Sequence, residues 1–220
     1  MIDLLDMGGG LVLPPEPVLR VAPEAARSVP RGPFGLGYCG IDPGLSGYFA
    51  VLAADGRAVL RQATAPAFLN GEGHPDRYDL AGMFALCRDL ASLVSLVIIE
   101  KQQAYPDQGA VSNYTTGYGY GLWCMALTAA GVPFEELAPI TWKKLMGIQA
   151  EPSPVGSEDP KKRRARMRKE ALARAVAKAQ SLFPGYDLRA TERSRVPSPD
   201  KATALLLATV ARRKHLGNTD

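Results

Sequence analysis

The sequence predicts an α/β fold on one mixed β-sheet, with three antiparallel meander strands, further parallel strands and helices on both faces. Asp55-Gly56, a strong hairpin signal, joins apolar segments at 48–53 and 58–64, and another apolar segment at 36–41 precedes them. Strand-like and helical patterns then alternate along the chain. Residues 93–100 have almost no polar alternation, which is typical of a central strand buried on both faces and parallel to its neighbour.

Start and stop signals divide the rest of the chain into helices and one short strand. Asp79 can cap a helix that runs to about residue 92, and Gly131 can end a helix that begins near residue 113. Asp159-Pro160 and Ser198-Pro199-Asp200 each combine a cap with a first-turn proline. The remaining expected elements are a strand at 133–137, helices at 141–146, 160–183 and 201–214, and loops at 65–77, 149–160 and 184–197.

Length and composition predict one domain at 36–216, a Pro/Gly-rich extension at 1–35 and a tail at 217–220. The formal net charge of +4 weakly favours a polyanionic partner. No apolar run approaches the ~18 residues that a membrane span needs, and the acidic start of the chain is unlike a secretory signal. The cysteines, Cys39, Cys87 and Cys124, are expected to be buried thiols rather than zinc ligands, which suits a cytoplasmic protein.

Three acidic residues stand at the ends of predicted elements. Asp42 ends the first strand, Glu100 ends the buried strand, and Asp200 lies in the first turn of the last helix. The carboxyl ends of parallel strands meet at one sheet edge, and a helix start tolerates a carboxylate. Taken singly, each acid has an ordinary explanation as a turn former, a solvated strand end or a helix-start residue. Together they predict a catalytic centre that binds Mg²⁺ through oxygen ligands, with two ions about 3.5–4 Å apart for phosphodiester hydrolysis.

Three segments carry a specific resemblance. Gly-Ile-Asp-Pro-Gly-Leu-Ser-Gly at 40–47, Val-Ile-Ile-Glu-Lys-Gln at 97–102 and the acid-led Ala/Leu-rich segment at 200–208 resemble, in order, the acidic motifs of the RuvC family of Holliday-junction resolvases. The Gly-rich segment and Thr-Trp-Lys-Lys at 141–144 are closer to phage-type members. The likeness covers residues 37–212.

This resemblance implies a ribonuclease-H-like domain that acts as a homodimer and hydrolyses four-way DNA junctions in recombination or repair. It also implies a dependence on Mg²⁺, with Mn²⁺ as a substitute, and a location in the cytoplasm, at the nucleoid, or in the host cytoplasm if a phage encodes the chain. One departure concerns the last motif, where the family usually has a second acid three positions after the first. Thr203 stands there. It shares a helix face with Asp200 and is expected to point at the metals as a poorer, neutral ligand. Glu192 or Asp187 could supply the missing charge.

A basic segment is the expected DNA contact. Seven of the nine residues at 161–169 are Lys or Arg, which is either a solvated helix face or a phosphate-binding surface. We favour phosphate binding, and the resemblance adds family positions at Lys143 and Lys144, one of which would stabilise charge at the scissile phosphate. The full set of predicted DNA contacts is Lys101, Tyr105, Lys143, Lys144, Lys161, Lys162, Arg163, Arg164 and Arg166.

Tyrosines and glycines interleave between residues 105 and 121. Each glycine costs a helix about 1 kcal/mol against alanine, so either a partner helix or DNA approaches closely, or the segment is a loop before a helix that starts near Gly121. The resemblance implies that this helix contributes to the dimer interface and that Tyr105 stacks on an unpaired base at the crossover.

Two other functions fit parts of the sequence. Thr203 suits a junction-binding protein with weak or lost cleavage. The Asp-x-Gly turn also occurs in actin-like and sugar-kinase-like ATPases, but those need a second phosphate loop and an adenosine-binding glycine motif, and the sequence has neither. ATP hydrolysis by the purified protein would favour the ATPase.

Overall fold

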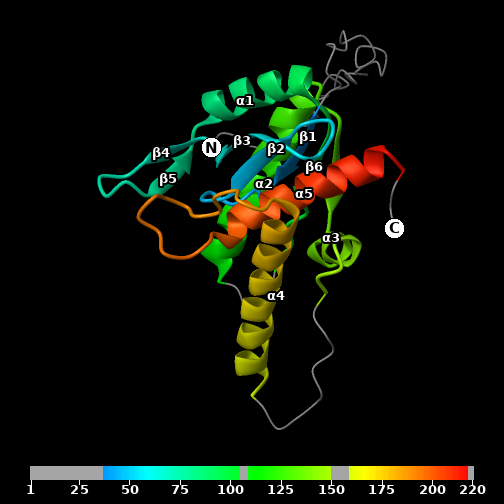
Figure 1. Cartoon of the computed structure of the whole chain (residues 1–220). Helices are drawn as coiled ribbons and strands as arrows, with labels where there is room; N and C mark the ends of the chain where they lie inside the picture. Colours follow the sequence, from blue (N-terminus) through cyan, green and yellow to red (C-terminus); the bar gives the residue numbers. More distant parts are fainter. Residues whose placement is uncertain (1–36, 105–108, 150–158, 218–220) are drawn as a thin grey trace, which may run out of the picture.

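The computed structural model describes residues 37–104, 109–149 and 159–217. The predicted extension at 1–35 and residues 218–220 of the predicted tail lie outside these ranges. Figure 1 shows one central sheet with helices on both faces. The predicted α/β fold is therefore confirmed.

The sheet has the strand order β3-β2-β1-β6-β7. β1 pairs with β2 in antiparallel and with β6 in parallel orientation, and β7 continues the parallel side. β6 lies in the middle of the parallel part and is almost fully buried, as its unbroken apolar sequence predicts. The strand bounds are Gly37–Ile41 for β1, Tyr48–Leu52 for β2, Val59–Thr64 for β3, Val94–Glu100 for β6 and Phe134–Leu137 for β7.

The helices begin at the predicted caps. The side chain of Asp79 accepts from Gly82 N at 3.0 Å, and that of Ser198 accepts from Lys201 N at 3.3 Å. Asp159 Oδ1 accepts from Lys162 N at 3.0 Å and so holds the start of the basic helix. The helix bounds are Leu80–Leu93 for α1, Ala110–Ala129 for α2, Pro139–Leu145 for α3, Pro160–Leu182 for α4 and Pro199–His215 for α5.

The sheet separates two apolar cores because successive strand residues face opposite sides. On one side, Ala50 and Ile98 pack with α5, whose residues 202–208 are all buried, and with the carboxyl-terminal part of α4. On the other side, Ile41 and Val97 pack with α1 and with Trp123 of α2. The amino-terminal part of α4 extends beyond this body (Figure 1).

One local prediction is wrong. Residues 65–77 are not a loop, since β4 (Ala67–Leu69) and β5 (Pro75–Tyr78) form a separate hairpin. Its turn is held by Asn70 Oδ1, which accepts from the backbone N–H groups of Glu72 and His74. For the segment with interleaved tyrosines and glycines, the helix expected from near residue 113 is confirmed: α2 starts at Ala110 and continues through Gly121, which excludes the alternative of a shorter helix.

None of the helices in the described part of the chain is both long enough and apolar enough to cross a membrane.

Candidate metal centre

Asp42 and Glu100 lie side by side at the carboxyl edge of the sheet. Ile41 pairs with Ile99 in the parallel register of β1 and β6, so the next residues on the two strands are the two acids. The sequence separates these residues widely, and the parallel pairing brings them together. This is the edge at which α/β sheets bind ligands.

The turn after Asp42 fixes its backbone and supports its carboxylate. Asp42 N donates to Tyr48 O at 2.9 Å, and Gly47 N donates to Gly44 O at 2.8 Å. The backbone N–H of Gly44 also donates to the Asp42 side chain, which lowers the pKa of that carboxyl. A β-carbon on Gly47 would overlap Asp42 O, so the turn is too tight for a side chain there.

Close packing of α5 on β1 adds Asp200 to the same edge. A β-carbon on Gly40 would overlap the backbone of Ala204 and Ala208, so the glycine lets the helix lie directly on the strand. Asp200 is in the first turn of α5, and Thr203 lies one turn further on the same face and is 6% exposed. Thr203 is therefore buried beside the acids, where the family pattern has a carboxylate.

The three carboxylates interact strongly. Burial, followed by the negative charges of Glu100 and Asp200, raises the pKa of Asp42 from 3.8 to about 8, and Lys143 opposes this rise. Burial also raises the pKa of Asp200, while Arg168 of α4 lowers it. Such a cluster of acids is costly without a cation, as is usual where carboxylates share a functional site.

Glu100 is held through both oxygens. The buried Trp142 of α3 donates from Nε1 to Glu100 Oε1 at 2.8 Å, and Gln102 Nε2 donates to Oε2 at 3.2 Å. Lys143 Nζ lies 5.3 Å from the centre of the Trp142 ring. The sequence prediction used the lysines of this motif and missed Trp142 and Gln102. A buried indole N–H needs an acceptor, and that signal could have pointed to Trp142.

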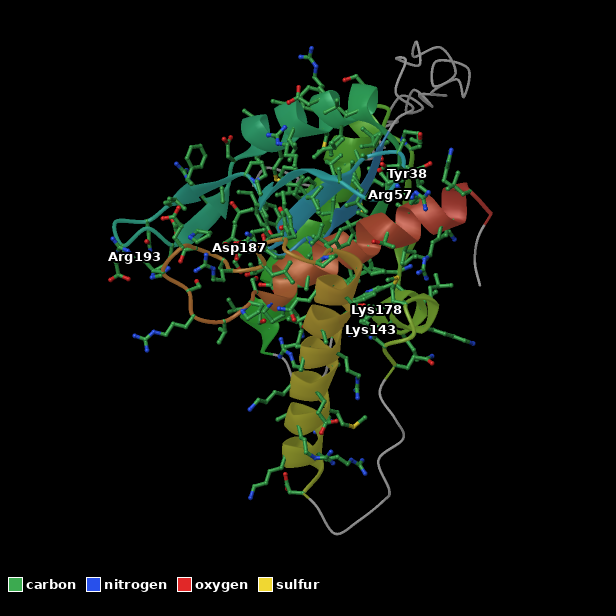
Figure 2. The ribbon with its side chains drawn as sticks, in the orientation of Figure 1. Tyr38, Arg57, Lys143, Lys178, Asp187 and Arg193 are labelled. Atoms are coloured by element: carbon green, nitrogen blue, oxygen red, sulfur yellow. The ribbon has the colours of Figure 1, made fainter. Side chains whose placement is uncertain are left out.

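The basic residues divide into two groups. Lys143 acts on Asp42 electrostatically, and Arg168, which the prediction omitted, acts on Asp200. The others stand further out: Lys162, Arg164 and Arg166 are exposed on α4, Arg163 is half-buried, and Lys144 is exposed on α3. Figure 2 shows nitrogen-bearing side chains around the projecting part of α4 and Lys143 on α3.

Three predicted DNA contacts need separate mention. Lys101 is exposed and lies 3.8 Å from Glu136 Oε2 in an ion pair. Tyr105 lies outside the described residues, and so does the side chain of Lys161.

Of the two acids considered as replacements at Thr203, Asp187 is engaged by Arg189 at 3.0 Å, and Glu192 is exposed.

The fit of a metal rests on the donor set. The three side chains offer only carboxylate oxygens, which suit Mg²⁺. The pKa of Asp42 is raised first by burial and then by the charges of Glu100 and Asp200, and a nearby cation would favour its ionised form. Among the residues that the structure describes, no three His, Cys, Asp or Glu side chains are arranged to hold an ion as they stand. Cys39 and Cys87 are buried as predicted, whereas Cys124 is only half-buried, and all three are free.

The mixed five-stranded sheet with helices on both faces is consistent with a ribonuclease-H-like α/β fold. Within that class, RuvC of Thermus thermophilus is a structural neighbour: its structure covers 83% of this chain and 98% of its own, with a TM-score of 0.51 and 18% identity. A second structure, T. thermophilus RuvC in complex with Holliday junction substrate, matches with the same TM-score and identity and covers 97% of its own chain. No protein-family model and no curated protein matches the sequence. The resemblance found in the motifs is thus confirmed as a likeness of fold.

Proposed function

We propose that this protein is a metal-dependent, structure-selective DNA endonuclease that resolves four-way junctions. The observation that carries the proposal is the parallel pairing of β1 and β6, which brings Asp42 beside Glu100, together with Asp200 at the start of α5. The similarity of fold to RuvC, one structure of which holds a Holliday junction, supports the same substrate class.

Each residue of the centre has a definable task. Asp42, Glu100 and Asp200 would hold two Mg²⁺ ions, or Mn²⁺ in their place, which supply stabilisation of charge on the attacking and leaving oxygens. Trp142 and Gln102 fix the orientation of Glu100. Lys143, which is close enough to shift the pKa of Asp42, would offset negative charge at the scissile phosphate.

The DNA would lie along the basic side of the molecule. Arg168 near Asp200 and the exposed cations further out on α4 provide a run of positive charge that leads away from the acids. Phosphate contacts of this kind give affinity without sequence preference. Lys144 and Lys101 would add contacts on the other side of Glu100.

A second copy of the chain would pack on α2. Val111 and Met125 are 81% and 68% exposed on this helix. No described atom lies within 4 Å of a β-carbon built on Gly117 or Gly121, so another backbone can approach closely. A two-fold dimer would set two centres on symmetric strands of a junction.

Thr203 supports one alternative, a junction-binding protein with weak or lost cleavage. A buried hydroxyl at this position cannot replace the charge of a carboxylate. This alternative predicts a stable complex with the junction and no strand scission in Mg²⁺ or Mn²⁺.

A labelled synthetic junction and a linear duplex distinguish these possibilities. Native protein should cut the junction in Mg²⁺ and spare the duplex, whereas Asp42→Asn and Glu100→Gln should bind the junction without cutting it. Glu135→Gln is the matched control, because Glu135 pairs with Lys214 at 2.8 Å and lies outside the centre. An uncut junction with native protein, or cleavage by both active-site variants, contradicts the nuclease.

A further inference from the structure

A pocket of about 540 Å³ opens beside the metal centre. Its walls come from the β4–β5 hairpin, from the start of α1 and from the first turns of α2. The aromatic side chains of this aromatic pocket are Phe68, Tyr78, Tyr114 and Tyr118. None of them has a role in the centre described above.

Two contacts join the aromatic pocket to the centre. Tyr78 Oη donates to the carbonyl of Pro43 at 3.1 Å, and Pro43 directly follows Asp42. Leu45, which belongs to the same turn, lines the pocket. The aromatic pocket therefore adjoins the turn that directly follows Asp42.

The aromatic rings are arranged as a stacking platform. Tyr114 and Tyr118 are nearly parallel, with an angle of 7° and centroids 6.0 Å apart, and Tyr78 meets Tyr118 edge-on at 6.2 Å. Phe68 and Tyr118 are each close to half exposed, and Tyr114 is 72% exposed. Open aromatic faces of this kind stack on nucleobases.

The charges around the pocket favour a base over a phosphate. Asp76 and Asp79 line it and would repel a phosphate group, while carboxylates accept hydrogen bonds from base amino groups. Arg77 covers the ring of Phe68 at 4.6 Å, which places one cation where a flanking phosphate could pair with it.

The chain also gives up helix stability to form this pocket. A β-carbon on Gly119 of α2 would overlap the hydroxyl of Tyr78. Tyr78 can therefore occupy this position only because the interior of the helix has a glycine here. The cost of such a glycine is about 1 kcal/mol relative to alanine. The close fit indicates that the position of Tyr78 matters.

We propose that the aromatic pocket stacks an unpaired base of the DNA strand that is cut at the centre, and so selects branched over linear DNA. The inference rests on the proposed function. Paired bases in a linear duplex are already stacked and cannot enter the pocket. A junction offers bases near the crossover that unpair at a lower cost.

The test is an abasic scan of a labelled four-way junction, with binding measured by anisotropy in EDTA so that cleavage is not required. Removing one base near the scissile phosphate should weaken binding by native protein about 10-fold, in keeping with the energy of one stacked base. Tyr118→Ala should bind the intact junction about 10-fold more weakly and show a flat abasic profile. Phe84→Ala, which removes an exposed aromatic ring of α1 that does not line the pocket, should keep the native profile.

Each other outcome counts against the inference. A flat profile with native protein that still cuts the junction overturns the stacking pocket and leaves the nuclease intact. Absence of junction binding by native protein overturns both the stacking pocket and the proposed junction nuclease. Tyr118→Phe keeps the aromatic ring and controls for misfolding. Its binding should still weaken when the one base near the scissile phosphate is removed. If Tyr114→Ala turns a dimer into a monomer and leaves the profile unchanged, the pocket belongs to a protein interface instead.

Discussion

Trp142 Nε1 donates to Glu100 Oε1 at 2.8 Å, and this contact links α3 to the acidic edge of the sheet. The indole is 1% exposed, so its direction is fixed by packing. Glu100 therefore has a set orientation before any ion binds.

Trp142→Phe should preserve the apolar contact and release Glu100. Loss of such an outer contact typically costs about 10–100-fold in metal affinity or activity, so more Mg²⁺ should be needed for half-maximal cleavage. Trp123→Phe is the matched control, because Trp123 is equally buried but its Nε1 has no hydrogen-bond partner among the residues that the structure describes. Equal Mg²⁺ requirements in the two variants would show that the hydrogen bond has no effect.

Metal-free protein should lose stability as pH rises. The pKa of Asp42 is about 8 in the folded protein, whereas an unfolded aspartate has a pKa of about 3.9. The folded state binds the proton of Asp42 more tightly than the unfolded state does. The resulting contribution to the free energy of unfolding is fully present below about pH 4 and is lost as pH rises through about 8. Asp42→Asn should therefore raise the melting temperature at pH 9 by a few degrees, since ~1 kcal/mol shifts it by about 2–4 °C in a chain of this size.

The same comparison at pH 5 should give a much smaller difference, because Asp42 is protonated there in the folded protein. Asp89→Asn is the matched control, because Asp89 is an aspartate at an exposed position, where it pairs with Arg61 at 3.7 Å. A constant difference between native protein and Asp42→Asn from pH 5 to 9 would contradict the raised pKa.

Thr203→Asp should restore a fourth carboxylate and retain or increase cleavage. The buried charge should also lower the stability of the metal-free protein, and Mg²⁺ should restore it by binding the folded state. Thr203→Asn has a similar shape without the charge and should produce neither effect. Cleavage below the native level in Thr203→Asp would show that the centre works with three acids alone.

Substitutions at the two glycines of α2 that face open space should change monomer stability and dimer formation in opposite directions. Gly117→Ala and Gly121→Ala meet no described atom, so each should stabilise the monomer by about 0.5–1 kcal/mol through helix propensity. The added methyl groups should weaken a dimer that packs on this face. Sedimentation and thermal unfolding measure the two effects, and an unchanged dimer would exclude this face as the interface.

Arg168→Gln should weaken junction binding and reduce the slope of log K against log[salt] by about 1, as expected for one lost phosphate contact. Arg57→Gln is the control, because Arg57 lies between β2 and β3, beyond the end of β2 that is away from Asp42. If the salt slopes of the two variants are equal, α4 does not carry the DNA near Asp200.

The pattern of apolar residues was sufficient for the main elements, because strands and helices that bury one face carry regular periodicities. It also placed Asp42 and Glu100 correctly, since both follow apolar strands whose carboxyl ends meet. The hairpin at residues 67–78 was missed because β4 and β5 are short and carry little apolar alternation. The extent of α2 was left open between two alternatives, because the glycines lower its intrinsic helix propensity.

Contacts between distant segments could not be predicted from local patterns. The hydrogen bond from Trp142 to Glu100 and the charge of Arg168 near Asp200 depend on how α3 and α4 pack on the sheet. Each pair is separated by more than 30 positions in the sequence. The aromatic pocket is a further example, because it needs the hairpin, α1 and α2 together.

The fit of the Tyr78 hydroxyl against Gly119 has a consequence for how this chain can change over evolutionary time. Neither position is expected to vary alone. A side chain at 119 displaces the tyrosine, and loss of the tyrosine leaves a glycine that lowers helix stability without a compensating contact. Chains that share the fold but lack the β4–β5 hairpin are expected to carry alanine or a larger residue at the equivalent of Gly119. The hairpin and the glycine should thus be gained and lost together, as a linked pair of mutations.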